Sequence, residues 1–410
     1  MSDVSWQIKS LSELGRFSRG KSKHRPRNDK KLFTNGTYPL IQTGDIKNAN
    51  LYVTKNSDYY NEFGLSQSKL WEQGTLCITI AANIAETAIL SYPMCFPDSV
   101  VGFNAYKNES SELFVYYVFE LLKKEIQKTS SGSIQDNINI DYLTKLKFKV
   151  PNKDYQDRIV NLLSTIDKKI LINNQINEEL EAMAKTLYDY WFVQFDFPDE
   201  NGKPYKSSGG KMVYNDQLKR EIPEGWGVKQ LGELSTYVTD KISSNDLNSK
   251  NYIGTDNMLS NMKGIEQATY LPNSTLVNSF ISNDILIANI RPYFKKIWIS
   301  DRAGGCSSDV LCLRANDKEI CNYLFYSLAR DDFFNYNVAG SKGSKMPRGD
   351  KAHIQKYSVL YSEKHAFKFS KLVSNFISQK HLIYKQNQEL SQLRDWLLPM
   401  LINGQAKVEE

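Results

Sequence analysis

The feature that most constrains this chain is a long stretch near its middle. Residues 154–193 contain no glycine or proline, and their apolar side chains recur at helical spacing. One stripe repeats every seven residues, has Asn173 as its polar member and consists of Ile159, Ile166, Leu180 and Leu187. A second stripe, interrupted at Lys169, consists of Leu162, Ile176, Met183 and Tyr190. A heptad pattern sustained over the whole stretch predicts a long coiled-coil helix.

The end of the chain contains a second copy of this stretch. A displacement of 210 positions brings Ile159 onto Phe369 and aligns the two stretches without a gap. A period of this length indicates a duplicated domain, because solenoid repeats run to about 20–50 residues. We expect the two helices to pair antiparallel, since a globular segment separates them, and we expect Pro399 to end or kink the second one a turn early. The residues of the copy that we expect to pack against the first helix are Phe369, Leu372, Phe376, Ile383, Leu390, Leu393 and Leu397.

Length and composition limit the class of protein. A chain of 410 residues is too long for one ordinary core and predicts two domains with connectors. The five cysteines are odd in number and contain no C-x-x-C pair, so we expect neither a disulfide framework nor a zinc site. The chain does not open on an apolar signal segment, and no run approaches the ~18 apolar residues of a membrane span. We therefore expect a cytoplasmic protein.

Alignment of the two halves predicts the domain organisation. Each half opens on a short element led by a tryptophan, Trp6 or Trp226, and continues through strands and polar loops to a long helix. The predicted fold class is α+β: two similar domains with mixed sheets and short helices, separated by two long antiparallel coiled-coil helices with an internal pseudo-two-fold. The predicted segments are a first domain (1–153), a central helix (154–194), a connector (195–225), a second domain (226–364), a C-terminal helix (365–404) and a tail (405–410).

The net charge of +6 is spread unevenly. Residues 16–31 hold eight Lys or Arg against a single Asp, interleaved with Gly, Ser, Pro and Asn. Such a segment favours contact with a nucleic-acid backbone, with an ordinary solvated loop as the alternative.

Several segments resemble one known family. They are IPEGW at 222–226 leading to LGEL at 231–234, YDYWFV at 188–193, and a Gly-Ser pair before the last strand of each half, at 132–133 and 343–344. RGKSKHRPRND followed by QTGDIKNAN, and IRPYFKK with GGCSSDV, are similar to two recurring types of target recognition domain. Over essentially its whole length the chain resembles the DNA-specificity (S) subunit of Type I restriction-modification systems.

The resemblance implies a division of labour. Two target recognition domains would each read one half of a split asymmetric DNA site, while the helices set the spacer and dock two modification (methyltransferase) subunits. Two restriction (translocase-nuclease) subunits would complete the complex, and S-adenosylmethionine, ATP and Mg would bind in the partners rather than in this non-catalytic chain. A helix of about 34 residues at ~1.5 Å per residue spans roughly 50 Å, or about 15 base pairs, so such a ruler is geometrically sensible.

In both halves, polar loops follow or interrupt the predicted strands, and we call these loops the tips. They supply the residue types that hold phosphates and read bases. In the first half, the expected phosphate contacts are Lys21, Lys23, Arg25 and Arg27, and the expected base contacts are Gln42, Thr43 and Asn83. In the second half, the expected DNA contacts are Asn257, Asn289, Arg291, Tyr293, Lys295 and Lys296, with Lys342, Lys345 and Arg348 on a later loop. For any one of them a solvated loop residue is the alternative. The order of predicted elements is the same in the two halves, while the residues at their tips differ. Two domains that read different half-sites require this combination.

Two features of the first helix have alternative interpretations. Asn173 either fixes the helix register or lies exposed. The aromatic end of the helix either belongs to an ordinary core or docks a modification subunit, through Tyr190, Trp191 and Phe192.

Three other classes of function were weighed. A DNA-modifying enzyme is disfavoured because the sequence contains no E-x-K triplet, no Asp/Asn-Pro-Pro-aromatic motif, no P-loop and no His pair at metal-ligand spacing. A purely structural coiled coil leaves two divergent domains and a localised basic segment without a purpose. A Type IIB-like recognition subunit with a fused restriction-methylation partner stays open, because only the neighbouring genes distinguish it from Type I.

Overall fold

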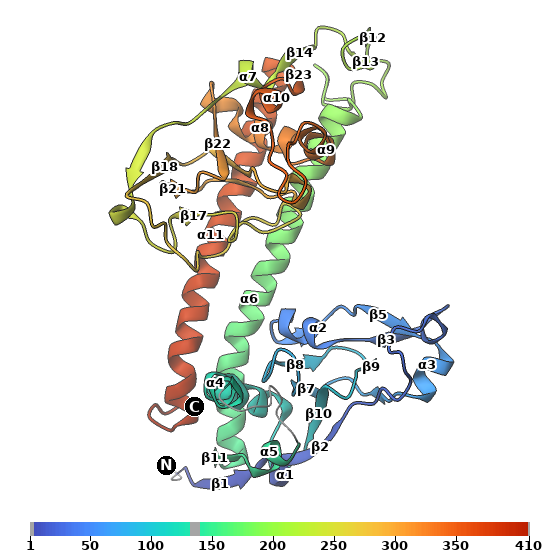
Figure 1. Ribbon diagram of the computed structural model, residues 1–410, viewed down its shortest axis with the longest axis vertical. Helices are drawn as coiled ribbons and strands as arrows, with labels where there is room; N and C mark the ends of the chain where they lie inside the picture. The colour runs from blue at the N-terminus through green and yellow to red at the C-terminus, as the bar shows by residue number, and fades with distance from the viewer. Residues whose placement is uncertain (1–3, 132–139, 409–410) are drawn as a thin grey trace. The chain divides into compact units, whose positions relative to one another are not determined.

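The computed structural model describes residues 4–131 and 140–408 (Figure 1). The chain forms two compact units, residues 1–173 with 386–410 and residues 174–385. Both long helices, α6 (Lys153–Tyr188) and α11 (Glu363–Ile402), pass from one unit into the other. Each unit therefore contains one globular domain and a portion of both helices. Gly132 and Ser133, one of the two Gly-Ser pairs, lie outside the described residues.

The domain of the first unit contains two sheets. The five-stranded sheet has the order β2 (Gly15–Arg19), β10 (Val100–Ala105), β7 (Leu76–Thr79), β8 (Thr87–Leu90) and β4 (Tyr52–Val53). The four-stranded sheet has the order β5 (Asp58–Tyr60), β3 (Tyr38–Leu40), β9 (Met94–Cys95) and β6 (Leu70–Trp71). All neighbours are antiparallel except β4 with β8 and β3 with β9. Both sheets are therefore mixed, as predicted.

The second unit repeats part of this topology. One of its sheets has the order β15 (Ser235–Tyr237), β22 (Val310–Ala315), β19 (Ile285–Ala288) and β20 (Ile297–Ile299), and corresponds to β2, β10, β7 and β8. The other has the order β16 (Lys241–Ser243), β18 (Leu276–Phe280), β21 (Gly304–Cys306) and β17 (Tyr252–Ile253). Its one parallel pair, β17 with β21, matches β3 with β9. The duplication seen in the helices thus extends to four strands of one sheet and to this parallel pair, while the outer strands differ.

Each domain begins and ends at its long helix. In the first unit β1 (Trp6–Ser10) pairs with β11 (Lys147–Pro151), and in the second β14 (Gly227–Gln230) pairs with β23 (Ser358–Tyr361). The strand that precedes each long helix is therefore tied to the first strand of its half. The shorter helices of the first unit are α1 (Leu11–Leu14), α2 (Thr43–Asn48), α3 (Glu62–Ser66), α4 (Glu112–Ser131) and α5 (Ile140–Lys145). Those of the second are α7 (Leu231–Leu234), α8 (Cys321–Leu328), α9 (Asp331–Ala339) and α10 (Lys351–Gln355).

The two long helices pair antiparallel, as predicted. In the first unit, Arg394 Nη1 lies 2.9 Å from Asp167 Oδ1, and Asn173 Nδ2 donates to Asn387 Oδ1 at 2.7 Å. In the second unit, the rings of Tyr188 and Phe369 pack edge to face at 5.6 Å. Rising numbers in α6 thus meet falling numbers in α11 within each unit. Asn173 is 1% exposed, so the alternative of an exposed position is wrong.

The first predicted stripe is the buried one. Ile159, Ile166, Leu180 and Phe369 are buried, and Leu187, Phe376, Ile383, Leu390 and Leu397 are partly buried. The second stripe is wrong by one position: between 37% and 51% of the side chain is exposed at Leu162, Ile176, Met183, Leu372 and Leu393. The neighbouring residues Leu163, Ala184 and Val373 are fully buried instead, because they belong to the cores that join the helices to the domains.

The expectation that Pro399 ends the second helix is wrong. Helix α11 continues three residues beyond Pro399, where losing one N–H near the end of a helix interrupts little of its hydrogen bonding. The predicted connector contains a hairpin of β12 (Met212–Asn215) and β13 (Arg220–Pro223). Its aromatic start, Phe195 and Phe197, is buried against Trp226. Among the described residues, no helix is both long and apolar enough to cross a membrane.

Candidate nucleic-acid interface

Three loops of the first domain adjoin the same end of neighbouring strands in its five-stranded sheet. Strand β2 ends where β10 begins and where β7 ends, since Arg19 faces Val101 and Val101 faces Ile78. The basic loop (20–31), the turn before β10 (96–99) and the tip between β7 and β8 (80–86) are therefore neighbours. Backbone bonds from Gly20 to Val100 (2.8 Å) and from Ile80 to Ser99 (2.9 Å) join them.

The basic loop is folded rather than loose. Arg27 donates to Asp98 at 2.6 Å, and Arg25 donates to the carbonyl of Ser22 at 2.5 Å. In the part of the chain that the structure describes, the ammonium groups of Lys21 and Lys23 form no ion pair, and both residues are exposed. The four predicted phosphate contacts thus divide into two lysines ready to meet a phosphate and two arginines that already share Asp98.

The first tip has a strained backbone. Ala82, Asn83 and Ala85 have left-handed φ angles of 48°, 55° and 60°. Such conformations cost about 1–3 kcal/mol each in residues other than glycine and cluster at functional sites. The exposed Asn83 side chain accepts from Lys47 Nζ at 3.3 Å, which connects the tip to α2. Gln42 is exposed at the start of α2, while Thr43 is half-buried.

The equivalent tip of the second domain, residues 289–296 between β19 and β20, has the same kind of backbone strain and is called the second tip. Arg291 and Lys295, with φ of 51° and 52°, flank a short 3₁₀ turn at Pro292–Phe294. The later loop is bonded to this tip: Arg291 N–H donates to Pro347 O at 2.7 Å, and Gly349 N–H donates to Asn289 O at 3.1 Å. The structure therefore unites two segments that the sequence predicted separately.

Carboxylates partly compensate the cations of this surface. Lys342 lies 2.6 Å from Asp350, Lys295 lies 2.7 Å from Asp331, and Arg348 lies 3.0 Å from Asp309. Hydrogen bonding to Lys342 and to the backbone N–H of His353 lowers the pKa of Asp350 to about 2. Lys296 donates to the carbonyl of Thr255 at 2.7 Å. Among the described residues, Arg291 and Lys345 have no ion-pair partner, so these two are the available charges of the surface.

Two predicted DNA contacts are wrong. Asn257 is 2% exposed, and its amide accepts from Gly254 N–H and donates to Tyr252 O and Glu266 O, so it stabilises a turn. Asn289 is 9% exposed, and a Cβ built on Gly349 would lie 2.8 Å from its Oδ1. Its side chain therefore faces the protein interior.

The predicted docking residues in the π-helical turn that follows α6 (Asp189–Val193) also need correction. Trp191 and Phe192 are 4% and 1% exposed, because the rings of Phe369 and Trp226 pack against them. They belong to the core of the second unit. Of the three residues, only Tyr190 keeps an exposed part; it lines a cavity of about 410 Å³ with Met183, Leu187 and Phe376.

Sequence reasoning missed Lys47 and Lys69. Lys47 donates to Asn83 on the first tip. Lys69 Nζ lies 3.5 Å from the centroid of the Trp71 ring. The hydroxyl of the adjacent Ser68 donates to the carbonyl of Lys21 at 2.9 Å, and burial, followed by the charge of Lys21, lowers the pKa of Lys69. The signal was absent from the sequence, because 48 positions separate these lysines and only the fold brings them together.

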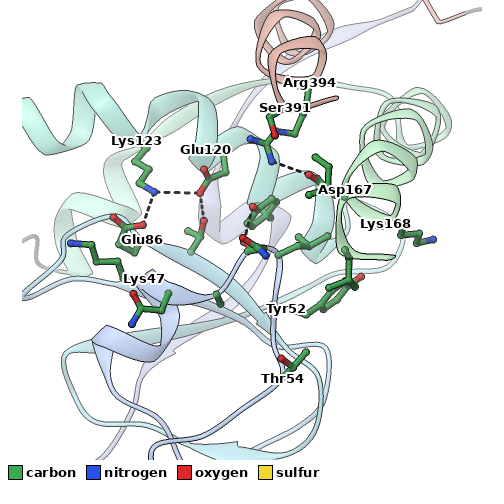
Figure 2. Close-up of a pocket in the computed structure, with 18 residues that line it drawn as sticks. Lys47, Tyr52, Thr54, Glu86, Glu120, Lys123, Asp167, Lys168, Ser391 and Arg394 are labelled. Carbon is green, nitrogen blue, oxygen red and sulfur yellow. Dashed lines mark hydrogen bonds and ion pairs between the residues drawn. The ribbon is translucent and has the colours of Figure 1, made fainter. Parts of the chain in front are cut away.

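A polar cavity of about 350 Å³ lies behind the first tip, between the domain and both long helices of that unit (Figure 2). On one side Lys123 lies 2.5 Å from Glu86, and Glu120 accepts from Thr87 at 2.8 Å. On the other side Arg394 reaches Asp167 (Figure 2). Burial raises the pKa of Glu120. The first group of contacts joins the tip to α4, and the second joins α11 to α6.

Comparisons with known proteins agree on one family. Residues 3–182 match the family model described as the Type I restriction modification DNA specificity domain. The chain is 25% identical over 430 residues to the Type I restriction enzyme MjaIX specificity subunit of Methanocaldococcus jannaschii, covering 99% of this chain and 94% of the relative. It is 22% identical over 364 residues to the Type I restriction enzyme HindI specificity subunit of Haemophilus influenzae, covering 73% and 75%. Its fold is similar to the crystal structure of the Type I restriction-modification S subunit from M. genitalium, with a TM-score of 0.55, 16% identity and coverage of 98% and 97%.

Proposed function

We propose that the chain is the sequence-specific DNA-binding subunit of a Type I restriction-modification complex, a proposal that the match of residues 3–182 to the Type I restriction modification DNA specificity model supports. One observation carries the proposal. Two domains that share a four-strand order in one sheet present different residues at equivalent, strained tips: Ala82–Asn83–Ala85 in one and Arg291–Lys295 in the other. A repeated frame with divergent tips is what two readers of two different sequences require.

Each domain then reads one half of a split site. In the first, Lys21, Lys23 and Lys69 meet phosphates, while Gln42 and Asn83 offer amides that can pair with adenine. In the second, Arg291 offers the planar donor pair that suits guanine, and Lys345 meets a phosphate. The uninterrupted α6, 36 residues long, sets the spacer.

The helices also dock the modification subunits. Exposed apolar residues of α6 recur at the same repeat positions of α11: Leu162 with Leu372, Ile172 with Leu382 and Met183 with Leu393. Apolar stripes of this kind mark protein-binding surfaces. Because the stripe occurs twice, two copies of one partner can each meet an equivalent surface. These residues replace Trp191 and Phe192 as the candidate docking surface.

The chemistry belongs to the partners in this proposal. Two methyltransferase subunits bind S-adenosylmethionine, and two translocase-nuclease subunits bind ATP and Mg. Within the described residues, no three His, Cys, Asp or Glu side chains gather closely enough to hold a metal ion. The chain contributes recognition and spacing.

The proposal is tested by producing the chain with its modification partner and mapping the methylated bases of the host genome. The expected result is a bipartite asymmetric site with a fixed spacer. Exchanging residues 1–150 for another recognition domain should change one half of that site and leave the other half unchanged. Methylation by the isolated chain, or a single short contiguous site, would contradict the proposal.

A further inference from the structure

The second tip exposes aromatic surface where the core does not need it. Tyr293 is 47% exposed and Phe294 39% exposed, and their ring centroids lie 4.8 Å apart. Pro292, beside them, is buried and anchors the turn. Exposed aromatic rings on an otherwise polar and cationic loop indicate a binding contact rather than packing.

The turn holds these rings in a fixed place. Arg291 and Lys295 flank it in left-handed conformations, which persist only when the surroundings impose them. Backbone bonds tie both sides of the turn: Arg291 to Pro347 at 2.7 Å, Asn261 to Phe294 at 2.9 Å and Met262 to Lys295 at 2.8 Å. The entropy of ordering the turn is therefore lost on folding and not on binding.

The neighbouring charges indicate which surface the ring meets. Arg291 precedes the turn and has no ion-pair partner among the described residues, and exposed cations continue along the loop at Lys345 and Arg348. In duplex DNA, the apolar group that the base edges present in the major groove is the C5-methyl of thymine, and an aromatic ring can pack against it. We propose that Tyr293 packs against a thymine methyl in the second half-site, beside a G·C pair that Arg291 contacts. This inference rests on the proposed function.

The first domain provides an internal comparison. Its equivalent tip, residues 82–86, contains no aromatic residue. The inferred thymine contact therefore belongs to the second half-site alone. A ring inserted between base pairs as a wedge is the alternative, and it predicts a kinked duplex rather than sensitivity to one methyl group.

The test uses the chain together with its modification partner and duplexes carrying the mapped site. The half-site read by residues 226–364 is assigned by domain exchange. Each of its thymines, on either strand, is replaced singly by deoxyuridine, which lacks only the methyl group. One replacement should weaken binding by wild type roughly fourfold, the value of one buried methyl group. The same replacement should have no effect on Tyr293→Ala and should keep its effect on Tyr293→Phe.

Replacements in the first half-site serve as the control, since they should affect wild type and Tyr293→Ala equally. The inference is overturned if no replacement in the second half-site weakens binding by wild type, or if Tyr293→Ala keeps the full effect. It is also overturned, in favour of a wedge, if Tyr293→Ala abolishes a duplex bend measured by energy transfer while the replacements have no effect. Absence of any site-specific binding by wild type overturns the proposed function itself, and this result differs from all the others.

Discussion

The guanidinium of Arg394 on α11 lies 2.9 Å from the carboxylate of Asp167 on α6, and the hydroxyl of Tyr117 on α4 donates to the same carboxylate at 2.6 Å. Asp167 is 8% exposed. Three helices of the first unit, one of them within the globular domain, thus meet at a single buried charge. The arrangement fixes the recognition domain to the helix pair, because a buried carboxylate is stable only while its donors stay in place.

Replacing Arg394 by Met should destabilise the protein by about 2–3 kcal/mol, since it leaves the Asp167 charge buried and without its cation. The value lies below that of a fully buried pair because the Arg394 side chain is 30% exposed. Urea denaturation measures the loss, and Asp167→Asn combined with Arg394→Met should restore most of it. Lys211→Met is the matched control: its pair with Glu224 is exposed, so we expect a much smaller change in stability. Equal losses for the two single variants would refute the role of burial.

The second tip and the later loop should separate in Gly349→Ala. A Cβ at this position would lie 2.3 Å from Asn337 Oδ1 and 2.8 Å from Asn289 Oδ1, and both side chains are buried. The loop must move away, carrying Arg348 with it. We expect binding to the second half-site to weaken by roughly 1–2 kcal/mol, as a mismatched base pair would weaken it.

Gly227→Ala is the matched control for Gly349→Ala, because a Cβ at Gly227 meets nothing within 4 Å. Binding to duplexes altered in one half-site at a time separates the two domains. If Gly349→Ala weakens recognition of both half-sites alike, or if Gly227→Ala behaves in the same way, the loop is not positioned by Gly349.

The sequence was sufficient for the framework of the fold. The spacing of apolar residues predicted both long helices, and the 210-residue displacement of Ile159 onto Phe369 predicted the duplication. The globular segment between the two helices predicted their antiparallel pairing. The sequence did not determine which helix face is buried. Leu162 and Leu163 are both apolar and adjacent, and only the packing of the domain against the helix selects Leu163.

Which of the predicted site residues are exposed could not be predicted from the sequence. Cationic and amide residues at the tips indicated where DNA would bind. Asn257 shares that chemistry, yet its amide is consumed by the backbone of its own turn, which depends on coordinates rather than on residue type. The proximity of Lys69 to Lys21 and the burial of Trp191 depend on long-range packing in the same way.

Lys21→Gln with Lys23→Gln should weaken DNA binding by nearly the same factor on every sequence. Both ammonium groups are exposed and, in the described chain, unpaired, so each can displace counterions from a phosphate. The slope of log affinity against log salt should fall by about 2, with the preferred site unchanged. Lys203→Gln with Lys206→Gln, two exposed lysines of the connector, is the control and should leave the slope unaltered. A shift of site preference without a change of slope would assign the loop to base reading instead.

Acid should destabilise the second unit through His365. Its ring packs against Phe197 and Trp226, with centroids at 4.2 Å and 5.0 Å, and burial lowers its pKa from 6.5 to about 4. The unfolded chain therefore takes up a proton below pH 6.5 that the folded protein refuses until about pH 4, so stability is lost as the pH falls through this window. Because the ring is only half-buried, we expect a loss of about 1–2 kcal/mol between pH 7 and 4.5, measured by urea denaturation. Tyr155 holds the equivalent position of the first half and packs against Trp6, so His365→Tyr preserves the packing and should remove this part of the pH dependence. If wild type and His365→Tyr lose stability in parallel, another group is responsible.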